Sequence, residues 1–267
     1  MKLIKPYFEI WEQQPGIQGV FQQIERAGRV CYKSEDKITD TSAKDFVKRM
    51  IKSGHGAVLE HGTVYLVIPA GNHTVDKYKT NKYSVVVDDI KSERYLVTTN
   101  YRVLVENDWF DDLIYICEST EYHERRYTVK FVCDRGVSHE FVRHRVFSFA
   151  QESTRYCNYS KDKFGNELTF IRPCWSLVPM NPEDYNGSFL EFLHESEDLY
   201  LSLIKEGWKP QEARGILPNA LKTELVMTGF QSDWKHFFEL RDSGSAHPQA
   251  RELAQPLHLK FRELNYV

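Results

Sequence analysis

The sequence has few cysteines, and they show no recognisable pairing pattern. Five are spread over 267 residues, at positions 31, 117, 133, 157 and 174, and none belongs to a C-x-x-C pair. An odd, widely spaced set argues against a disulfide framework. The absence of paired cysteines also argues against a structural zinc site. We therefore expect free, buried thiols and no bound metal.

Long apolar runs and a dominant charge sign are also absent. No stretch approaches the roughly 20 apolar residues that cross a bilayer, and residues 1–11 lack the continuous apolar part of a signal peptide. The formal net charge is −3, which makes genomic nucleic acid an unfavourable partner. We expect a cytoplasmic protein that binds neither membranes nor nucleic acid.

One stretch of this mildly acidic chain is strongly basic. Residues 125–155 contain six Arg and one Lys against Asp134, Glu140 and Glu152, a local excess of four positive charges. Its densest part, residues 143–156, holds three Arg, one His, two Ser and one Thr. Because Arg predominates over Lys, the composition favours bidentate binding of phosphate or carboxylate. The stretch predicts a pocket for a specific small anion.

Hydrophobic periodicity predicts a mixed α and β chain that forms one domain. A polar loop is expected over residues 72–81, and Ser42 with Asp45 suggests a capping box at a helix start. The helix at 188–205 should bury Phe192 and Leu199. Predicted helices cover residues 18–32, 42–51, 109–117, 137–147, 188–205, 211–217, 221–228, 234–240 and 249–264, and predicted strands cover 63–68, 83–87, 95–99, 127–133 and 168–171.

Three local patterns suggest other chemistries, and each lacks a required feature. His139 and His144 are five residues apart, so a helix would hold their imidazoles roughly 140° apart, too far round to share the zinc ion of an H-E-x-x-H protease. Ser153 has no Gly-x-Ser-x-Gly elbow around it. Cys174 stands in Pro-Cys-Trp, without the His that follows the nucleophile in cysteine-dependent thymidylate synthases. We interpret Ser153 as a phosphate ligand and Cys174 as structural.

Two arginines outside the basic stretch have ordinary explanations. Arg214 follows Glu212-Ala213 on a mostly apolar predicted helix, where a surface arginine lays its stem along the protein. Arg241 ends a predicted helix, where a cation interacts favourably with the helix dipole. The residue types alone leave both roles open.

Several ordered motifs resemble those of the flavin-dependent thymidylate synthases. Arg-His-Arg followed by seven residues and Ser is that family's hallmark, and residues 143–153 contain it in full. Residues 154–156 extend the match. The resemblance covers roughly residues 20–260, and its supporting motifs are Gly54-His55, Glu60-His61, residues 213–218, residues 237–241 and residues 246–248.

The resemblance implies a transferase that converts dUMP to dTMP. Methylenetetrahydrofolate would supply the carbon, FAD would carry the hydride, and NADPH would reduce the flavin. It also implies an α+β fold with a central, mostly antiparallel sheet flanked by helices. Family members are homotetramers whose active sites are shared between subunits, and we expect the same of this chain. Residues 69–124 would be a family-variable insertion, in which residues 99–102 are polar enough to reach a ligand.

By the same resemblance, Arg241 would lie against the uracil and act as the catalytic residue. An arginine stays protonated and cannot serve as a base, but it can stabilise the negative charge that makes C5 of uracil electron-rich. The residues implied to contact FAD are Arg143, His144, Arg145, Gln151, His236 and His55. Those implied to contact dUMP are Glu140, Arg143, Gln151, Ser153, Thr154, Arg155, Arg214 and Arg241.

The sequence departs from the family at Gln151, where many members have Glu, and at Cys31 and Ala57, where many have hydroxyl residues.

Two other functions also fit the basic stretch. One is a phosphate-ester hydrolase in which His144 is the nucleophile or acid. The other is a module without catalysis that binds nucleotides or RNA through basic and aromatic side chains.

Overall fold

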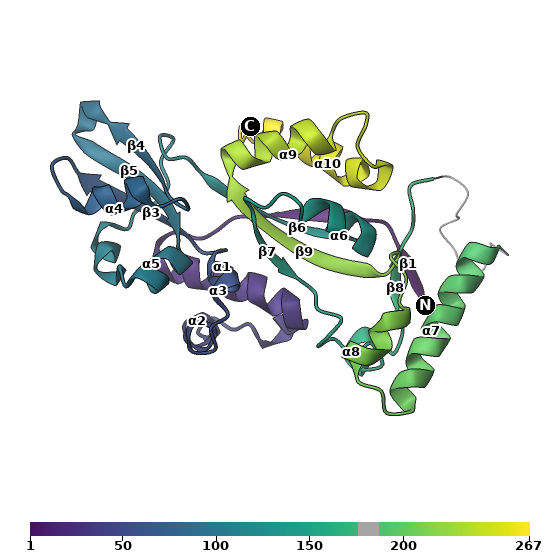
Figure 1. The fold of residues 1–267 in the computed structure, drawn as a ribbon. Coiled ribbons are helices and arrows are strands. Elements are labelled where there is room, and N and C mark those ends of the chain that lie inside the picture. Colours follow the sequence, from purple (N-terminus) through teal and green to yellow (C-terminus); the bar gives the residue numbers. More distant parts are fainter. Residues whose placement is uncertain (176–186) are drawn as a thin grey trace.

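The computed structural model describes residues 1–175 and 187–267, and a four-stranded sheet forms its centre (Figure 1). The strand order is β2 (Tyr7–Trp11), β6 (Arg126–Asp134), β9 (Lys222–Phe230) and β7 (Ser148–Gln151). All three pairings are antiparallel, and helices cover the sheet. The predicted α+β fold with a mostly antiparallel sheet is confirmed.

Strand β9 is the inner strand that pairs with both β6 and β7, so the predicted helix over residues 221–228 is wrong. Leu225 and Met227 belong to the core on one face of the sheet, and Val226 belongs to the core on the other. Because both faces are covered, the strand has no exposed polar side to mark a period of two. A short run of this kind cannot be distinguished from a buried helix by periodicity alone.

One face of the sheet is covered by α6 (Arg135–Phe141), α9 (Gln231–Arg241) and α10 (Pro248–Glu263) (Figure 1). Its core is aromatic. Phe237 is fully buried, and its ring centroid lies 5.1 Å from that of Phe141 and 5.3 Å from that of Trp234. The centroid of the Phe131 ring in β6 lies 6.2 Å from that of Phe237, so these rings hold α9 against both α6 and the sheet and fix the position of its last residue, Arg241.

The opposite face is covered by α1 (Gly16–Tyr32), with α2 (Ser42–Lys52) and α3 (Gly56–Leu59) packed beside it. Ala27 and Val30 of α1 lie against Ala150 and Val226 of the sheet. The expected capping box at α2 is absent, because Thr41 rather than Ser42 is the N-cap residue and its side chain makes no capping hydrogen bond. The Ser42 hydroxyl lies within hydrogen-bond distance of Glu25 and of the Thr39 carbonyl.

A second antiparallel sheet, in the order β3 (Thr63–Pro69), β5 (Arg94–Asn100) and β4 (Val85–Asp89), projects to one side (Figure 1). It carries α4 (Thr74–Thr80), α5 (Tyr101–Asn107) and the 3₁₀ segments η2 (Ile90–Ser92) and η3 (Phe110–Tyr115). The loop predicted over residues 72–81 is wrong, because α4 buries Val75 and Tyr78 against this sheet. The helix predicted over 109–117 is only the tighter η3. That residues 69–124 are a family-variable insertion stays a prediction.

The third part pairs β1 (Lys2–Ile4) in parallel with β8 (Thr169–Ile171), close to α7 (Ser188–Lys205) and α8 (Pro210–Ala213). Short 3₁₀ segments are η1 (Glu35–Lys37), η4 (Asp162–Phe164) and η6 (Arg214–Ile216). Phe192 and Leu199 of α7, predicted to face inward, are 52% and 48% exposed. Within the described ranges, no helix has the length and apolar character needed to cross a membrane.

Truncating Phe237 should destabilise the protein strongly, because its fully buried ring joins α9 to α6 and the sheet. We expect Phe237→Ala to lower the free energy of unfolding by about 3–5 kcal/mol, measured by urea denaturation. Phe192→Ala, which truncates an exposed ring on α7, is the matched control and should have a much smaller effect. Equal losses in the two variants would contradict this account of the core.

Candidate active site

The Arg-His-Arg motif lies in a tight turn between α6 and β7. The predicted helix over residues 137–147 is wrong beyond Phe141, where α6 ends. The amide of His144 donates to the carbonyl of Phe141, and the amide of Phe147 donates to the carbonyl of His144. The Phe147 ring packs edge-on against Trp234, with 4.8 Å between centroids. This anchor turns the chain into β7 and leaves Arg143 and Arg145 exposed.

Arg241, at the end of α9, clamps α6 to this turn. Its Nη1 donates to Glu140 Oε2 at 2.8 Å, and its Nη2 donates to the Glu140 carbonyl at 2.7 Å. Its Nε donates to Nε2 of His144 at 2.9 Å. Three of the five guanidinium N–H groups are thus engaged, and two remain. Only 14% of the Arg241 side chain is exposed, so the Glu140 carboxylate is an essential counter-charge.

The contact with Arg241 fixes the state of His144. Since a guanidinium only donates hydrogen bonds, His144 Nε2 must accept, and the ring proton must be on Nδ1. Burial and the neighbouring Arg241 cation lower the pKa of His144 to about 4. His144 is therefore neutral near pH 7 and is poorly suited to donate a proton as a general acid.

The Glu140 carboxylate also reaches Arg143, whose Nη1 lies 3.2 Å from its Oε1. The Arg143 side chain is 69% exposed, so this second pair is weak. His236 lies on the exposed side of α9 beside Glu239, and its ring centroid is 6.4 Å from that of His144. These residues form one cluster with Arg241, which we call the guanidinium cluster: Glu140, Arg143, His144, Arg145, His236 and Arg241.

A second cluster follows the end of β7. The Ser153 amide donates to the carbonyl of Cys31 in α1, and the Ser153 hydroxyl accepts from the amide of Arg155. Arg214, just after α8, donates through Nη1 to the Thr154 hydroxyl at 3.4 Å. We call Ser153, Thr154, Arg155 and Arg214 the hydroxyl–arginine cluster.

Three arginines of the two clusters have no acidic partner. Within the described part of the chain, no carboxylate lies within 4.0 Å of the guanidinium nitrogens of Arg145, Arg155 or Arg214. All three side chains are exposed. The Arg155 guanidinium lies 5.2 Å from the centre of the Tyr156 ring. Exposed guanidinium groups without counter-charges suit an anionic ligand.

One chain does not bring the two clusters together. His144 packs on Phe237 of α9, which covers one face of the central sheet. Ser153 bonds to α1, which covers the other. Gln151 faces the first side, where its amide donates to Ser138 and Thr223. His55, also expected near the flavin, is exposed at the start of α3 and joins neither cluster.

A cavity of about 410 Å³ adjoins the guanidinium cluster at Glu140. Trp175 and His247 stand edge to face in its wall, with 6.2 Å between ring centroids. Of these two rings, only His247 was indicated by the sequence, in the motif at residues 246–248. The other lining residues are Asp134, Gly136, Val137, Ile171, Pro173, Phe189, Asn219, Ala220 and Gln249.

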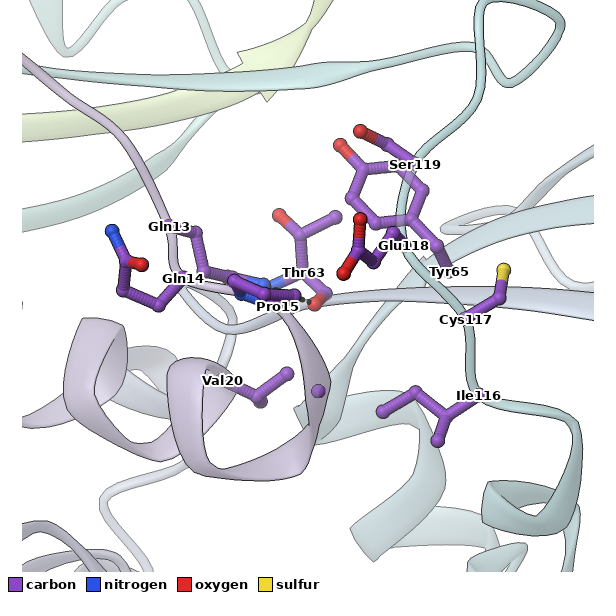
Figure 2. A pocket seen from close by; sticks show the side chains of 11 residues that line it. Gln13, Gln14, Pro15, Val20, Thr63, Tyr65, Ile116, Cys117, Glu118 and Ser119 are labelled. Atoms are coloured by element: carbon purple, nitrogen blue, oxygen red, sulfur yellow. Dashed lines mark hydrogen bonds between the residues drawn. The ribbon is translucent and has the colours of Figure 1, made fainter.

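A smaller cavity of about 180 Å³ lies between the start of α1 and the segment before β6 (Figure 2). Tyr65, Cys117 and Glu118 stand on one side of it, and Gln13 bonds to the Thr63 backbone on the other. None of the site residues predicted from the sequence lines it. In residues 1–175 and 187–267, no three His, Cys, Asp or Glu side chains are grouped to hold a metal ion.

Residues 106–264, more than half of the chain, match the family model described as thymidylate synthase complementing protein. The chain belongs to this family. The matched range contains both clusters but not His55, which belongs to neither of them. It confirms the family resemblance predicted from the motifs.

Curated relatives in this family are named flavin-dependent thymidylate synthase. The one from Thermococcus onnurineus (strain NA1) is 36% identical over 122 residues, 46% of this chain and 48% of the relative. The alignment therefore spans about half the length of this relative. The one from Corynebacterium aurimucosum is 24% identical over 268 residues, 96% of this chain and 82% of the relative.

A solved structure, a UMP/dUMP methylase PolB from Streptomyces cacaoi bound with 5-Br dUMP, is 17% identical to this family member. It aligns with a TM-score of 0.46 over 99% of this chain and 93% of that one.

The neutral His144 should make stability depend on pH. Its pKa is about 4 in the folded chain and near 6.5 when unfolded, so the unfolded chain binds more protons between these values. Its contribution to stability is complete above about pH 6.5 and is lost as the pH falls towards about 4. We expect His144→Gln, which can still accept from Arg241, to lose less stability than the wild type between about pH 7 and pH 5.

Urea denaturation at the two pH values measures this difference. Burial and Arg126 lower the pKa of His61 to about 3, so this buried histidine also makes stability fall with falling pH. It does so in both proteins, so the difference between wild type and His144→Gln reports His144 alone. Identical pH dependence in the two proteins would show that His144 is not held neutral by the fold.

Proposed function

We propose that this protein is a flavin-dependent thymidylate synthase that methylates dUMP to dTMP. Methylenetetrahydrofolate supplies the carbon and NADPH the reducing equivalents. One observation carries the proposal most directly. Arg241, a partly buried guanidinium held by Glu140 and by neutral His144, keeps two N–H groups free beside exposed Arg143. Membership of the family supports it.

Arg241 is proposed to bind the uracil ring and stabilise negative charge on it. The guanidinium stays protonated, and its contacts with α6 fix its direction before the substrate arrives. A cation that needs no reorientation during the reaction is effective at stabilising developing charge. In this way the uracil C5 becomes nucleophilic without a covalent bond to the protein.

The state of the cysteines agrees with a route that uses no thiol nucleophile. Burial raises the pKa of Cys31 to about 11 and that of Cys157 to about 12. Burial also raises the pKa of Cys117 and Cys133. Cys174 is exposed, so the expectation that all five thiols are buried is wrong for it, but limited desolvation raises its pKa as well. All five are therefore thiols rather than thiolates near pH 7, and the thiolate is the reactive form.

The exposed arginines of the Arg-His-Arg turn fit a flavin dinucleotide. Arg145 has no acidic partner in the described structure and Arg143 has only a weak one, so both can pair with a diphosphate. When bound, FAD would supply the hydride transfer that the side chains cannot perform. The residues proposed to hold it are Arg143, His144, Arg145, Gln151, His236 and His55.

The hydroxyl–arginine cluster is proposed to bind the phosphate of dUMP. Ser153 and Thr154 offer hydroxyl groups, and Arg155 and Arg214 offer guanidinium groups without acidic partners. Since this cluster and Arg241 lie on opposite faces of the sheet, one active site would take the phosphate ligands from one chain and the uracil ligand from another. Glu140, Arg143 and Gln151 are proposed to contact the nucleotide as well. The predicted homotetramer supplies such neighbours.

The purified protein should bind FAD, show a flavin absorbance band, and form dTMP from dUMP, methylenetetrahydrofolate and NADPH. Arg241→Ala should retain the flavin but lose dTMP formation by a factor of about 10²–10³ or more, because it removes a fixed charge at the uracil. Arg94→Ala, which breaks an ion pair with Asp89 in the second sheet, should remain active. A protein that binds no added FAD would contradict the proposal, and normal turnover by Arg241→Ala would remove Arg241 from the uracil site.

Mixed oligomers test whether the two clusters meet between chains. Arg241→Ala and Arg155→Ala should each be nearly inactive alone. After subunit exchange, chance pairing should restore about a quarter of wild-type activity, because some sites then receive intact residues from both chains. Differently tagged chains would verify the exchange. No recovery after verified exchange would mean that each site is built from one chain.

A further inference from the structure

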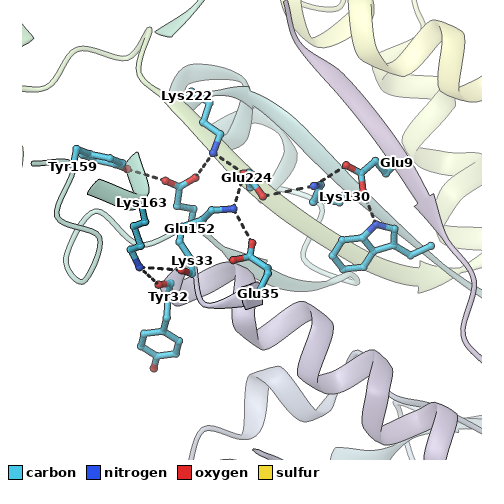
Figure 3. A network of polar contacts seen from close by, with 11 residues as sticks. Glu9, Tyr32, Lys33, Glu35, Lys130, Glu152, Tyr159, Lys163, Lys222 and Glu224 are labelled. Carbon is cyan, nitrogen blue, oxygen red and sulfur yellow. Dashed lines mark hydrogen bonds and ion pairs between the residues drawn. The ribbon is translucent and has the colours of Figure 1, made fainter. Parts of the chain in front are cut away.

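A network of charged side chains includes Glu152, the residue directly before the hydroxyl–arginine cluster (Figure 3). Lys222 at the start of β9 stands between two carboxylates, with its Nζ 2.8 Å from Glu152 Oε2 and 2.6 Å from Glu224 Oε1. Lys33 extends the network from Glu224 to Glu35. The network thus joins the central strand to the end of α1 and to the residue just before Ser153.

Glu152 is the member that touches the cluster's loop. Its side chain is 1% exposed, although it immediately precedes Ser153, whose loop is proposed to bind phosphate. The Tyr159 hydroxyl donates to Oε1 at 3.0 Å and Lys222 donates to Oε2, so both oxygens are engaged. The Glu152 amide donates to the Glu224 carbonyl at 2.8 Å. The backbone and the carboxylate of Glu152 are therefore both held in place by hydrogen bonds.

The charges of this network depend on one another. Burial alone would raise the pKa of Glu224, but Lys222 and Lys33 outweigh it and lower that pKa to about 2. Burial would lower the pKa of Lys222, and Glu152 and Glu224 raise it. The charged forms of Glu224 and Lys222 are thus stabilised by their partners. Removing Lys222 would leave the buried Glu152 carboxylate without its cation.

We propose that Lys222 is a positioning residue for the phosphate site, acting through Glu152. By holding that carboxylate inward, Lys222 fixes the backbone from which Ser153, Thr154 and Arg155 project. It also neutralises a negative charge that would otherwise repel a phosphate dianion at the next residue. This role rests on the proposed function of the cluster, and it concerns the phosphate rather than the uracil.

The protein contains a matched control for a purely stabilising ion pair. Lys77 Nζ lies 2.7 Å from Asp112, which is 8% exposed, and the Tyr78 hydroxyl donates to the same carboxylate at 2.6 Å. This lysine, carboxylate and tyrosine repeat the arrangement of Lys222, Glu152 and Tyr159. They lie in α4 and η3, beside the second sheet, and touch neither cluster, so Lys77→Met reports loss of an ion pair without a link to phosphate.

The experiment compares Lys222→Met with Lys77→Met in steady-state turnover. We expect Lys222→Met to raise the KM for dUMP about 10-fold, with kcat changed less than about threefold. The inhibition constant of deoxyuridine, which lacks the phosphate, should stay unchanged. The double variant Lys222→Met with Glu152→Gln should recover part of the dUMP affinity, because the unpaired carboxylate is gone. Lys77→Met should keep the wild-type KM.

Equal KM values in Lys222→Met and wild type would overturn the proposal, as would a parallel loss of deoxyuridine binding. If Lys222→Met does not fold, the single variant Glu152→Gln is measured in its place. A ratio of dUMP affinity to deoxyuridine affinity equal to that of the wild type would then also overturn the proposal. A wild type that neither binds dUMP nor forms dTMP would refute the proposed function itself, which separates that failure from one confined to Lys222.

Discussion

The alternation of side chains along β9 is the constraint on which the two clusters depend. Thr223 faces α6 and bonds to Gln151, whereas Lys222 and Glu224 face the end of α1. Because successive side chains of a strand point to opposite faces, one strand supports both clusters and keeps them apart. A shift of one residue in its pairing would exchange the two environments.

On the α9 side of the sheet, the Arg241 cation is partly buried and is paired with the Glu140 carboxylate. Burying the Arg241 guanidinium has a desolvation cost, which Glu140 offsets through two hydrogen bonds. The remaining contact sets the tautomer of His144 and keeps that ring neutral. In the proposed function, a guanidinium fixed in this way would recognise one ligand group in one orientation, whereas the exposed Arg145 would pair with a phosphate in several orientations.

The motif at residues 143–153 and its supporting motifs allowed the family to be predicted, and the α+β class followed from that resemblance. The members of both clusters were among the residues that the resemblance implied, but their division between the two faces of the sheet was not predicted. Most long helices were also predictable from period. The helix predicted over 221–228 failed because a strand covered on both faces loses its polar side. The predicted end of α6 was wrong because Phe147 packs against Trp234, and a contact between residues so far apart in the sequence leaves no local pattern. The Lys222–Glu152 ion pair and the Trp175–His247 ring contact could not be predicted from the sequence either, because neither pair has a characteristic spacing.

The separation of the clusters by the thickness of a sheet has a consequence for regulation. In the proposed assembly, the gap between phosphate and uracil ligands is set by how two chains pack rather than by any bond within one. Reaction rates are sensitive to displacements of about 1 Å between catalytic groups and substrate. An effector bound far from the substrate, or a substitution at a subunit contact, can therefore tune turnover by sliding one chain against its neighbour while every side chain in the site remains intact.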